Sequence, residues 1–160
     1  MNTVCVTTER SAAGMAREVL SLFKLRIGFL IMITAVVGYV ATPGHASVFQ
    51  VLVMALATLV ASAAAGAFNH YHDHDSDRLM ARTRTRPFAS GTLPHHPAWL
   101  LLFAGMLLAA VAAAWQVVNP QSAIFVFLGA FFYAVIYTVW LKRRSWTNII
   151  IGGLAGSFAV

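Results

Sequence analysis

The sequence has few charged residues. Asp, Glu, Lys and Arg make up 10% of its 160 residues, while 59% are hydrophobic, and an ordinary soluble domain is roughly 25% charged. This scarcity excludes an ordinary soluble domain and places the chain in a lipid bilayer. Cysteine is almost absent as well, because Cys5 is the single one. An internal disulfide and a cysteine-based zinc site are therefore excluded.

The first twenty residues lack an apolar core of the length that a secretory signal needs, and they carry Glu9, Arg10, Arg17 and Glu18. We therefore expect no cleaved signal peptide. Residues 1–19 are interpreted as a cytoplasmic leader. The leader is also not an Arg-rich, acid-poor presequence, so we expect a bacterial inner membrane rather than a mitochondrion.

Positive charge is confined to three segments that alternate with long uncharged ones. The basic residues are Arg10, Arg17, Lys24 and Arg26, then Arg78, Arg82, Arg84 and Arg86, and finally Lys142, Arg143 and Arg144. Although the net charge is +6, this clustering is what membrane topology requires and does not favour nucleic-acid binding. Loops rich in Lys and Arg stay on the cytoplasmic side, so the sequence predicts a cytoplasmic N-terminus.

Four apolar stretches reach the length of about 20 residues that a membrane-spanning helix needs. They cover residues 20–42, 48–68, 99–118 and 123–141. A fifth, 148–160, would rise only about 20 Å as a helix, short of a hydrocarbon core of about 30 Å. We expect an all-α polytopic membrane protein, a transmembrane helix bundle with four complete spans and a truncated fifth.

All three aspartates of the chain lie together, at Asp73, Asp75 and Asp77. If the second helix continues past Phe68, then Asn69, Asp73 and Asp77 share one face and Asp75 points elsewhere. Carboxylates beside lipid are costly unless they are neutralised, and a divalent cation neutralises several hard oxygen ligands at once. Mg²⁺ usually takes one or two carboxylates together with substrate phosphates.

Arginines follow the aspartates directly, at positions 78, 82, 84 and 86. Guanidinium groups suit two-pronged contacts with phosphate. The combination favours a magnesium-bound diphosphate over a bare cation. The alternative is that the arginines only obey the positive-inside rule and pair with the aspartates at the membrane surface.

Histidines are interleaved with this segment. His70 and His74 share a helical face, which is compatible with a transition metal or with axial ligation of haem. No further spaced ligand supports a closed zinc site. We favour solvated histidines at the membrane interface.

The aspartate-rich segment resembles the first aspartate-rich motif of the intramembrane UbiA-type prenyltransferases, in the form found in protohaem IX farnesyltransferases (haem O synthases). Two further stretches resemble this group, Lys24-Leu25-Arg26 and the run from Tyr137 to Arg144 with Asn148 to Gly153. The residues that carry the main resemblance are Asn69, Asp73, Asp75, Asp77, Met80, Arg82, Thr83, Arg86 and Pro87. One departure is Leu25, where the family usually has proline.

The resemblance implies transfer of a farnesyl group from farnesyl diphosphate to a vinyl group of haem b, giving haem O, with Mg²⁺ assisting the loss of diphosphate. It also implies that residues 20–160 form the N-terminal half of a longer transmembrane domain with a second aspartate-rich motif. We therefore expect the chain to be a fragment that is inactive alone. The implied partners are farnesyl diphosphate, haem b as substrate, the lipid bilayer, and haem A synthase or oxidase assembly proteins.

The resemblance also assigns roles to residues. Asn69, Asp73 and Asp77 are expected to act in catalysis and to bind magnesium, and Tyr137 to line the prenyl cavity. Direct contacts with diphosphate are expected from Arg26, Arg82, Arg86, Lys142 and Arg143. For these cations and the tyrosine, anchoring at the membrane interface remains an alternative.

Three other functions are weighed. Another UbiA-type prenyltransferase, acting on an aromatic or quinone precursor, would share most of the motif. A haem-binding helix bundle without enzymatic activity would explain the histidines but not the spacing of the aspartates and arginines. A CDP-alcohol phosphotransferase needs glycine at the position of Arg78 and aspartates at the positions of His95 and Trp99, so its pattern fails.

Overall fold

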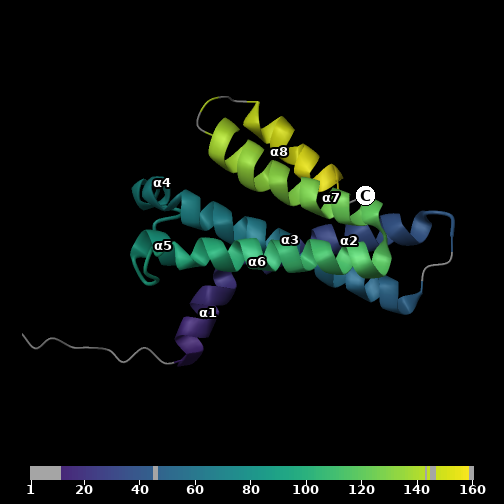
Figure 1. The fold of residues 1–160 in the computed structure, drawn as a ribbon. Coiled ribbons are helices and arrows are strands. Elements are labelled where there is room, and N and C mark those ends of the chain that lie inside the picture. The colour runs from purple at the N-terminus through teal and green to yellow at the C-terminus, as the bar shows by residue number, and fades with distance from the viewer. Residues whose placement is uncertain (1–11, 45–46, 143, 145–146, 159–160) are drawn as a thin grey trace, which may run out of the picture.

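The computed structural model describes residues 12–44, 47–142, 144 and 147–158, and these residues form a bundle of helices (Figure 1). The longest helix, α3, contacts α2 along one side and α6 and α7 along others. The helices are α1 (Ala12–Leu22), α2 (Leu25–Ala41), α3 (Val48–His72), α4 (His74–Leu79), α5 (Pro87–Ser90), α6 (Ala98–Ala113), η1 (Ala114–Val118), α7 (Pro120–Phe131), η2 (Phe132–Leu141) and α8 (Asn148–Ser157).

Three of these helical segments are long and apolar enough to cross a membrane, namely Val48–His72, Ala98–Val118 and Pro120–Leu141. A fourth span exists if the bent pair α1 and α2 crosses as one unit, and α8 is a shorter apolar helix. The described chain is thus helical with several candidate spans, in agreement with a polytopic membrane protein.

The first predicted span needs a correction. The sequence predicted one segment over residues 20–42, whereas the structure has two helices that meet at an angle of 49°. Lys24 forms the break, with φ 44° and ψ 43°. A side chain other than glycine rarely adopts this left-handed conformation, and it ends one right-handed helix before the next begins.

Local signals explain where two of the spans begin. The Ser47 side chain accepts a hydrogen bond from the Gln50 backbone, and the Gln50 side chain returns one to Ser47, so a capping box starts α3. The Asn119 side chain caps α7 by accepting a hydrogen bond from the Ser122 N–H, and Pro120 occupies the first turn, where its missing N–H costs nothing.

Alanine dominates the interior of the bundle. The larger buried cluster contains Ala57, Ala61 and Ala65 of α3 together with alanines of α6 and α7. Small side chains let helix backbones approach closely, which is how helices associate in lipid. The many exposed leucines, isoleucines and phenylalanines are therefore expected to face lipid.

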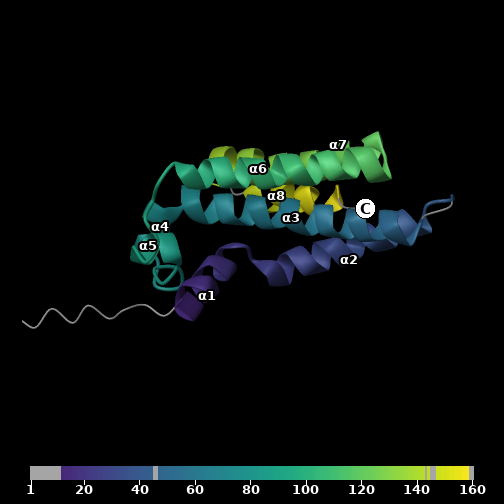
Figure 2. The same ribbon diagram turned by 60° about the horizontal axis from the view of Figure 1, so that its bottom comes forward.

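The polar elements gather at one end of the bundle. Helices α1, α4 and α5 lie together at the end where α3 finishes (Figure 2). A second buried cluster, with Leu22, Ala67 and Phe88 among its members, joins α1 and α5 to α3. This end is where the aspartate-rich segment lies.

Candidate functional site

The aspartate-rich segment contains a helix break at Asp73, between α3 and α4. Helix α3 continues past Phe68, where the predicted span ends, and stops at His72. The register nevertheless survives the break, because the Asp73 N–H donates to the Asn69 carbonyl (3.0 Å) and the Asp77 N–H to the Asp73 carbonyl (2.8 Å). Asn69, Asp73 and Asp77 are therefore buried together, with 2%, 2% and 4% of their surface exposed. The Asp75 side chain is 74% exposed.

Each of the three buried groups is held by a cation from a different part of the chain. Lys24 Nζ donates to Asn69 Oδ1 at 3.0 Å, and Arg86 Nη1 donates to Asp77 Oδ2 at 2.7 Å. Lys142 Nζ pairs with Asp73 Oδ2. A buried carboxylate is costly unless it is paired and hydrogen-bonded, so these contacts explain how the two aspartates are kept in the interior.

Further hydrogen bonds join α3 to η2. The Asn69 side-chain amide donates to Asp73 Oδ2 (2.8 Å) and to Thr138 Oγ1 (3.2 Å). Lys24 Nζ also donates to the Tyr133 hydroxyl at 3.3 Å. We call the set Lys24, Asn69, Asp73, Asp77, Arg86, Thr138 and Lys142 the rim network. It connects four separate stretches of sequence at one end of the bundle.

The expected diphosphate contacts divide into two groups. Arg86 and Lys142 belong to the rim network, whereas Arg26 and Arg82 are exposed and lie outside it. The position of Arg26 follows from that of Lys24. Lys24 points toward the rim network, and a residue two positions further along a helix points to a nearly opposite side. Arg26 lies beside Phe29 and Leu59 instead. Arg143 lies outside the described residues.

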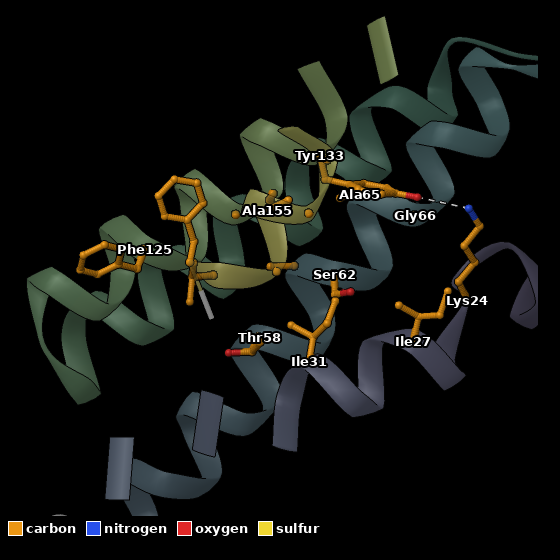
Figure 3. A pocket seen from close by; sticks show the side chains of 18 of the residues that line it. Lys24, Ile27, Ile31, Thr58, Ser62, Ala65, Gly66, Phe125, Tyr133 and Ala155 are labelled. Atoms are coloured by element: carbon orange, nitrogen blue, oxygen red, sulfur yellow. Dashed lines mark hydrogen bonds between the residues drawn. The ribbon is translucent and has the colours of Figure 1, made fainter. Parts of the chain in front are cut away.

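A cavity of about 280 Å³ opens from the rim network into the bundle, between α2, α3, α7 and α8. Lys24 and Tyr133 lie at the end near the rim, and Phe125 lies at the opposite end (Figure 3). Between them the wall is made largely of apolar and small residues, including Ile31 and Ala65. The cavity therefore joins a charged mouth to an apolar interior.

Tyr137 was expected to line the prenyl cavity. Its ring lies against Gly152 of α8, where an added Cβ would come within 2.7 Å of Tyr137 Cδ2, and it stacks on Tyr133 at a centroid distance of 5.4 Å. Gly152 and Tyr133 both line the cavity, so Tyr137 lies beside two residues of its wall. The wide turns of η2, with hydrogen bonds from residue i+5 to residue i, begin at Phe132 and shift Tyr137 from its α-helical register.

Sequence reasoning missed three members of this region, Lys24, Tyr133 and Thr138. Lys24 was noticed, but a lysine at the start of an apolar run was interpreted as an interfacial anchor. Its left-handed backbone conformation directs the side chain inward, and the sequence carries no signal for that conformation at a lysine. Thr138 and Tyr133 are uncharged residues within an apolar stretch, so nothing in the sequence marks them as part of the site. Only the fold shows that they lie beside it.

The histidines are dispersed. His70 is buried, and neither ring nitrogen has a hydrogen-bond partner in the described part of the chain. His74 stacks on His95 with ring centroids 3.9 Å apart, and His95 also stacks on Tyr71. Among the described residues, no group of three or more His, Cys, Asp or Glu is placed to hold a metal ion.

The rim network suits magnesium in one respect. Two carboxylates and one amide oxygen are hard oxygen ligands, and Mg²⁺ usually completes such a small protein set with water and substrate phosphates. The cations beside the carboxylates are compatible with a phosphate ligand, which needs positive charge around it. Asn69, Asp73 and Asp77 are thus the residues that would hold the ion together with its ligand.

Comparison with known proteins gives a consistent result. The model of the UbiA prenyltransferase family matches residues 30–160. "Protoheme IX farnesyltransferase 2" of Paramagnetospirillum magneticum is 53% identical over 141 residues, covering 88% of this chain and 49% of that protein. "Protoheme IX farnesyltransferase" of Pyrobaculum neutrophilum is 41% identical over 137 residues, covering 85% and 49%.

The chain spans about half the length of these curated relatives. No solved structure matches it. The family match covers most of the chain and includes the whole rim network except Lys24. The chain therefore belongs to the UbiA prenyltransferase family.

Proposed function

We propose that this chain serves the transfer of a farnesyl group from farnesyl diphosphate to a vinyl group of haem b. The observation that carries the proposal is the rim network at the mouth of an apolar cavity: two buried carboxylates, three cations and a space that accepts a hydrocarbon chain. The relatives named protoheme IX farnesyltransferase support the choice of haem b as acceptor.

In this reaction the allylic carbon–oxygen bond of farnesyl diphosphate breaks, and the diphosphate departs with the bonding electrons. The vinyl group of haem supplies the electrons for the new carbon–carbon bond. Water then adds to the resulting cation and loses a proton, which gives the hydroxyethylfarnesyl side chain. Charge accumulates on the leaving diphosphate, so that is where the protein must supply compensation.

The rim network supplies that compensation in two ways. Asn69, Asp73 and Asp77 would hold magnesium, which when bound stabilises the leaving group as a Lewis acid. Arg86 and Lys142 stand next to the carboxylates and donate to phosphate oxygens when the ligand enters. Lys24 touches both the network and the cavity, so it is positioned beside the bond that breaks.

The apolar cavity excludes water from the prenyl group. A farnesyl cation that met water too early would be quenched. The wall of the cavity offers few polar groups, and the two closest to the rim, Lys24 and the Tyr133 hydroxyl, are hydrogen-bonded to each other. The prenyl chain is therefore held dry while its diphosphate end stays at the charged mouth.

We also propose that the rim faces the cytoplasm of a bacterium, because the loops at this end carry the basic residues. Ser90 is exposed at the end of α5. A cysteine reagent that cannot cross the membrane should leave Ser90→Cys unlabelled in intact cells and label it after permeabilisation. Labelling of Ser90→Cys in intact cells would show that the rim faces outward and contradict the proposed orientation.

The activity is tested with the protein expressed from its own gene in a bacterial membrane. Wild-type membranes should convert haem b and farnesyl diphosphate to haem O, and Asp73→Asn should abolish the conversion while bound haem is retained. The double variant His70→Ala with His74→Ala should keep most of the transfer. Transfer to an aromatic quinone precursor instead of haem b would assign a different acceptor, and haem binding without any transfer would indicate a haem carrier.

A further inference from the structure

The depth of the cavity can be measured along α3, because one face of this helix forms its wall from the rim to the far end. Its wall on this helix is formed by Gly66, Ala65, Ser62, Ala61, Thr58 and finally Met54, at the spacing of one helical face. The residues are small near the rim and become larger with distance from it. Their distance from the rim follows from the rise of the helix, about 1.5 Å per residue.

Larger side chains line the far end of the cavity. Met54 is 7% exposed and belongs to the same buried cluster as Ala123 and Val126 of α7. Phe125 of α7 lies at the end opposite Lys24 (Figure 3). Its ring stacks with that of Phe158, at a centroid distance of 6.4 Å. The buried Met54 side chain therefore takes up space at this end, where the α3 wall nearer the rim has only small residues.

The depth of the cavity matches a particular chain length. Thr58 is eleven residues from Asn69, or about 16 Å along the helix axis, and Met54 is fifteen residues away, or about 22 Å. An extended chain advances about 1.2 Å per bond, the value for a peptide of about 3.5 Å per three bonds, so an isoprene unit of four chain bonds advances about 5 Å. Three units reach the level of Thr58, and a fourth enters the space that Met54 fills.

We infer that Thr58 and Met54 determine the length of the prenyl chain that the site accepts: Thr58 contacts the third isoprene unit, and Met54 blocks a fourth. The inference rests on the proposed function, because it takes a prenyl diphosphate to be the ligand of the rim network. It adds specificity-determining residues that lie far from the charged groups and take no part in the chemistry.

Three variants of the full protein test the inference. Met54→Ala enlarges the far end of the cavity, and Thr58→Leu fills the space expected for the third isoprene unit. Leu56→Ala is the matched control, because Leu56 is an exposed residue of the same helix turn. Binding is measured by competition, with unreactive thiolo-analogues of geranyl, farnesyl and geranylgeranyl diphosphate, which carry two, three and four isoprene units.

Met54→Ala should tighten binding of the four-unit analogue about tenfold or more, the discrimination that even one methylene group produces in an apolar pocket. Thr58→Leu should weaken the three-unit analogue by a similar factor and leave the two-unit analogue bound. Leu56→Ala should keep the wild-type preference. A gain in binding cannot arise from misfolding, so Met54→Ala keeps the test decisive if Thr58→Leu is unstable.

Two failures can be told apart. If wild type binds the three-unit analogue but the preference for length is unchanged in Met54→Ala and Thr58→Leu, the length inference is wrong and the proposed function stands. If wild type binds none of the three analogues, the proposed function is wrong and the length inference falls with it.

Discussion

Two groups of similar residues in one short segment have opposite environments. Asp73, Asp77 and Arg86 are packed into the rim network, while Asp75 and Arg82, from the same motif, are exposed. The residue types are the same, and the difference is position. The aspartates differ in the helical face on which they lie, whereas Arg82 and Arg86 both lie in the turn between α4 and α5, from which only Arg86 reaches Asp77. Position, rather than the number of charges, therefore separates the groups that can hold a ligand from those that meet solvent or lipid headgroups.

The largest difference in stability and in farnesyl transfer is expected between Asp73→Asn and Asp75→Asn. Asp73→Asn leaves the Lys142 ammonium without its counter-charge, and breaking a buried pair typically costs about 3–5 kcal/mol. Farnesyl transfer should be lost as well. Asp75→Asn should keep transfer near wild type, because its side chain is solvated. The two variants are compared by their rates of farnesyl transfer in membranes, normalised to the amount of folded protein.

A similar contrast is expected between the arginines. Arg86→Lys removes a fork that donates to Asp77 and to the proposed diphosphate, and a hydrogen bond to a charged group is worth about 1.5–3 kcal/mol. Binding of farnesyl diphosphate should weaken by about ten- to a hundredfold. Arg82→Lys serves as the control and should bind as wild type does. Equal losses would place Arg82 in the site and contradict the assignment by burial.

Lys24 offers a test that separates charge from backbone shape. Lys24→Gly and Lys24→Met both remove the ammonium that donates to Asn69, so both should weaken diphosphate binding. Glycine adopts the left-handed conformation without strain, whereas methionine does not, so Lys24→Gly should be more stable by about 1 kcal/mol. Thermal unfolding in detergent gives the stability difference. A more stable Lys24→Met would show that the break at residue 24 is not strained.

The smallest effect is expected from Arg84→Gln, which changes an exposed charge outside the rim network. Surface substitutions usually alter stability by less than about 0.5 kcal/mol. Thermal unfolding and farnesyl diphosphate binding should both match wild type within error. A substantial loss of magnesium-dependent binding in Arg84→Gln would show that exposed residues outside the rim network also take part in binding the diphosphate.

Most helices could be placed from the sequence, because apolar length is a strong signal. The stretches 48–68, 99–118 and 123–141 correspond to Val48–His72, Ala98–Val118 and Pro120–Leu141. The break within the first predicted span could not be predicted, since hydropathy does not report backbone angles. The run from Leu20 to Thr42 is apolar on both sides of Lys24, and the bend lies in one residue's φ and ψ.

The site could be predicted where it follows helical register within one segment. Spacing by four residues placed Asn69, Asp73 and Asp77 together, and the backbone preserves that spacing across the break at Asp73. Contacts between segments could not be predicted in the same way. Tyr133 lines the cavity and Tyr137 packs on Gly152 beside it. The wide turns of η2 that set the position of Tyr137 could not be predicted, because the sequence of η2 resembles that of an ordinary α-helix.

The structure also decides which pair of residues can test for a shared ligand. Asp77 and Arg86 are both proposed to act on one diphosphate, so Asp77→Asn and Arg86→Ala would be non-additive if they share it. These side chains touch each other directly, so a double-mutant cycle between them shows coupling with or without a ligand. Arg86 and Lys142 bind different carboxylates and are the better pair for detecting a shared diphosphate.

The central claim is that the rim network holds a diphosphate through magnesium. Isothermal titration of farnesyl diphosphate into the wild-type protein, with magnesium and then with a chelator, tests it most directly. We predict that wild-type binding is strong with magnesium and lost with the chelator, and that Asp77→Asn binds weakly whether or not magnesium is present. Equal affinity with and without magnesium, or an unaltered magnesium requirement in Asp77→Asn, would contradict the account.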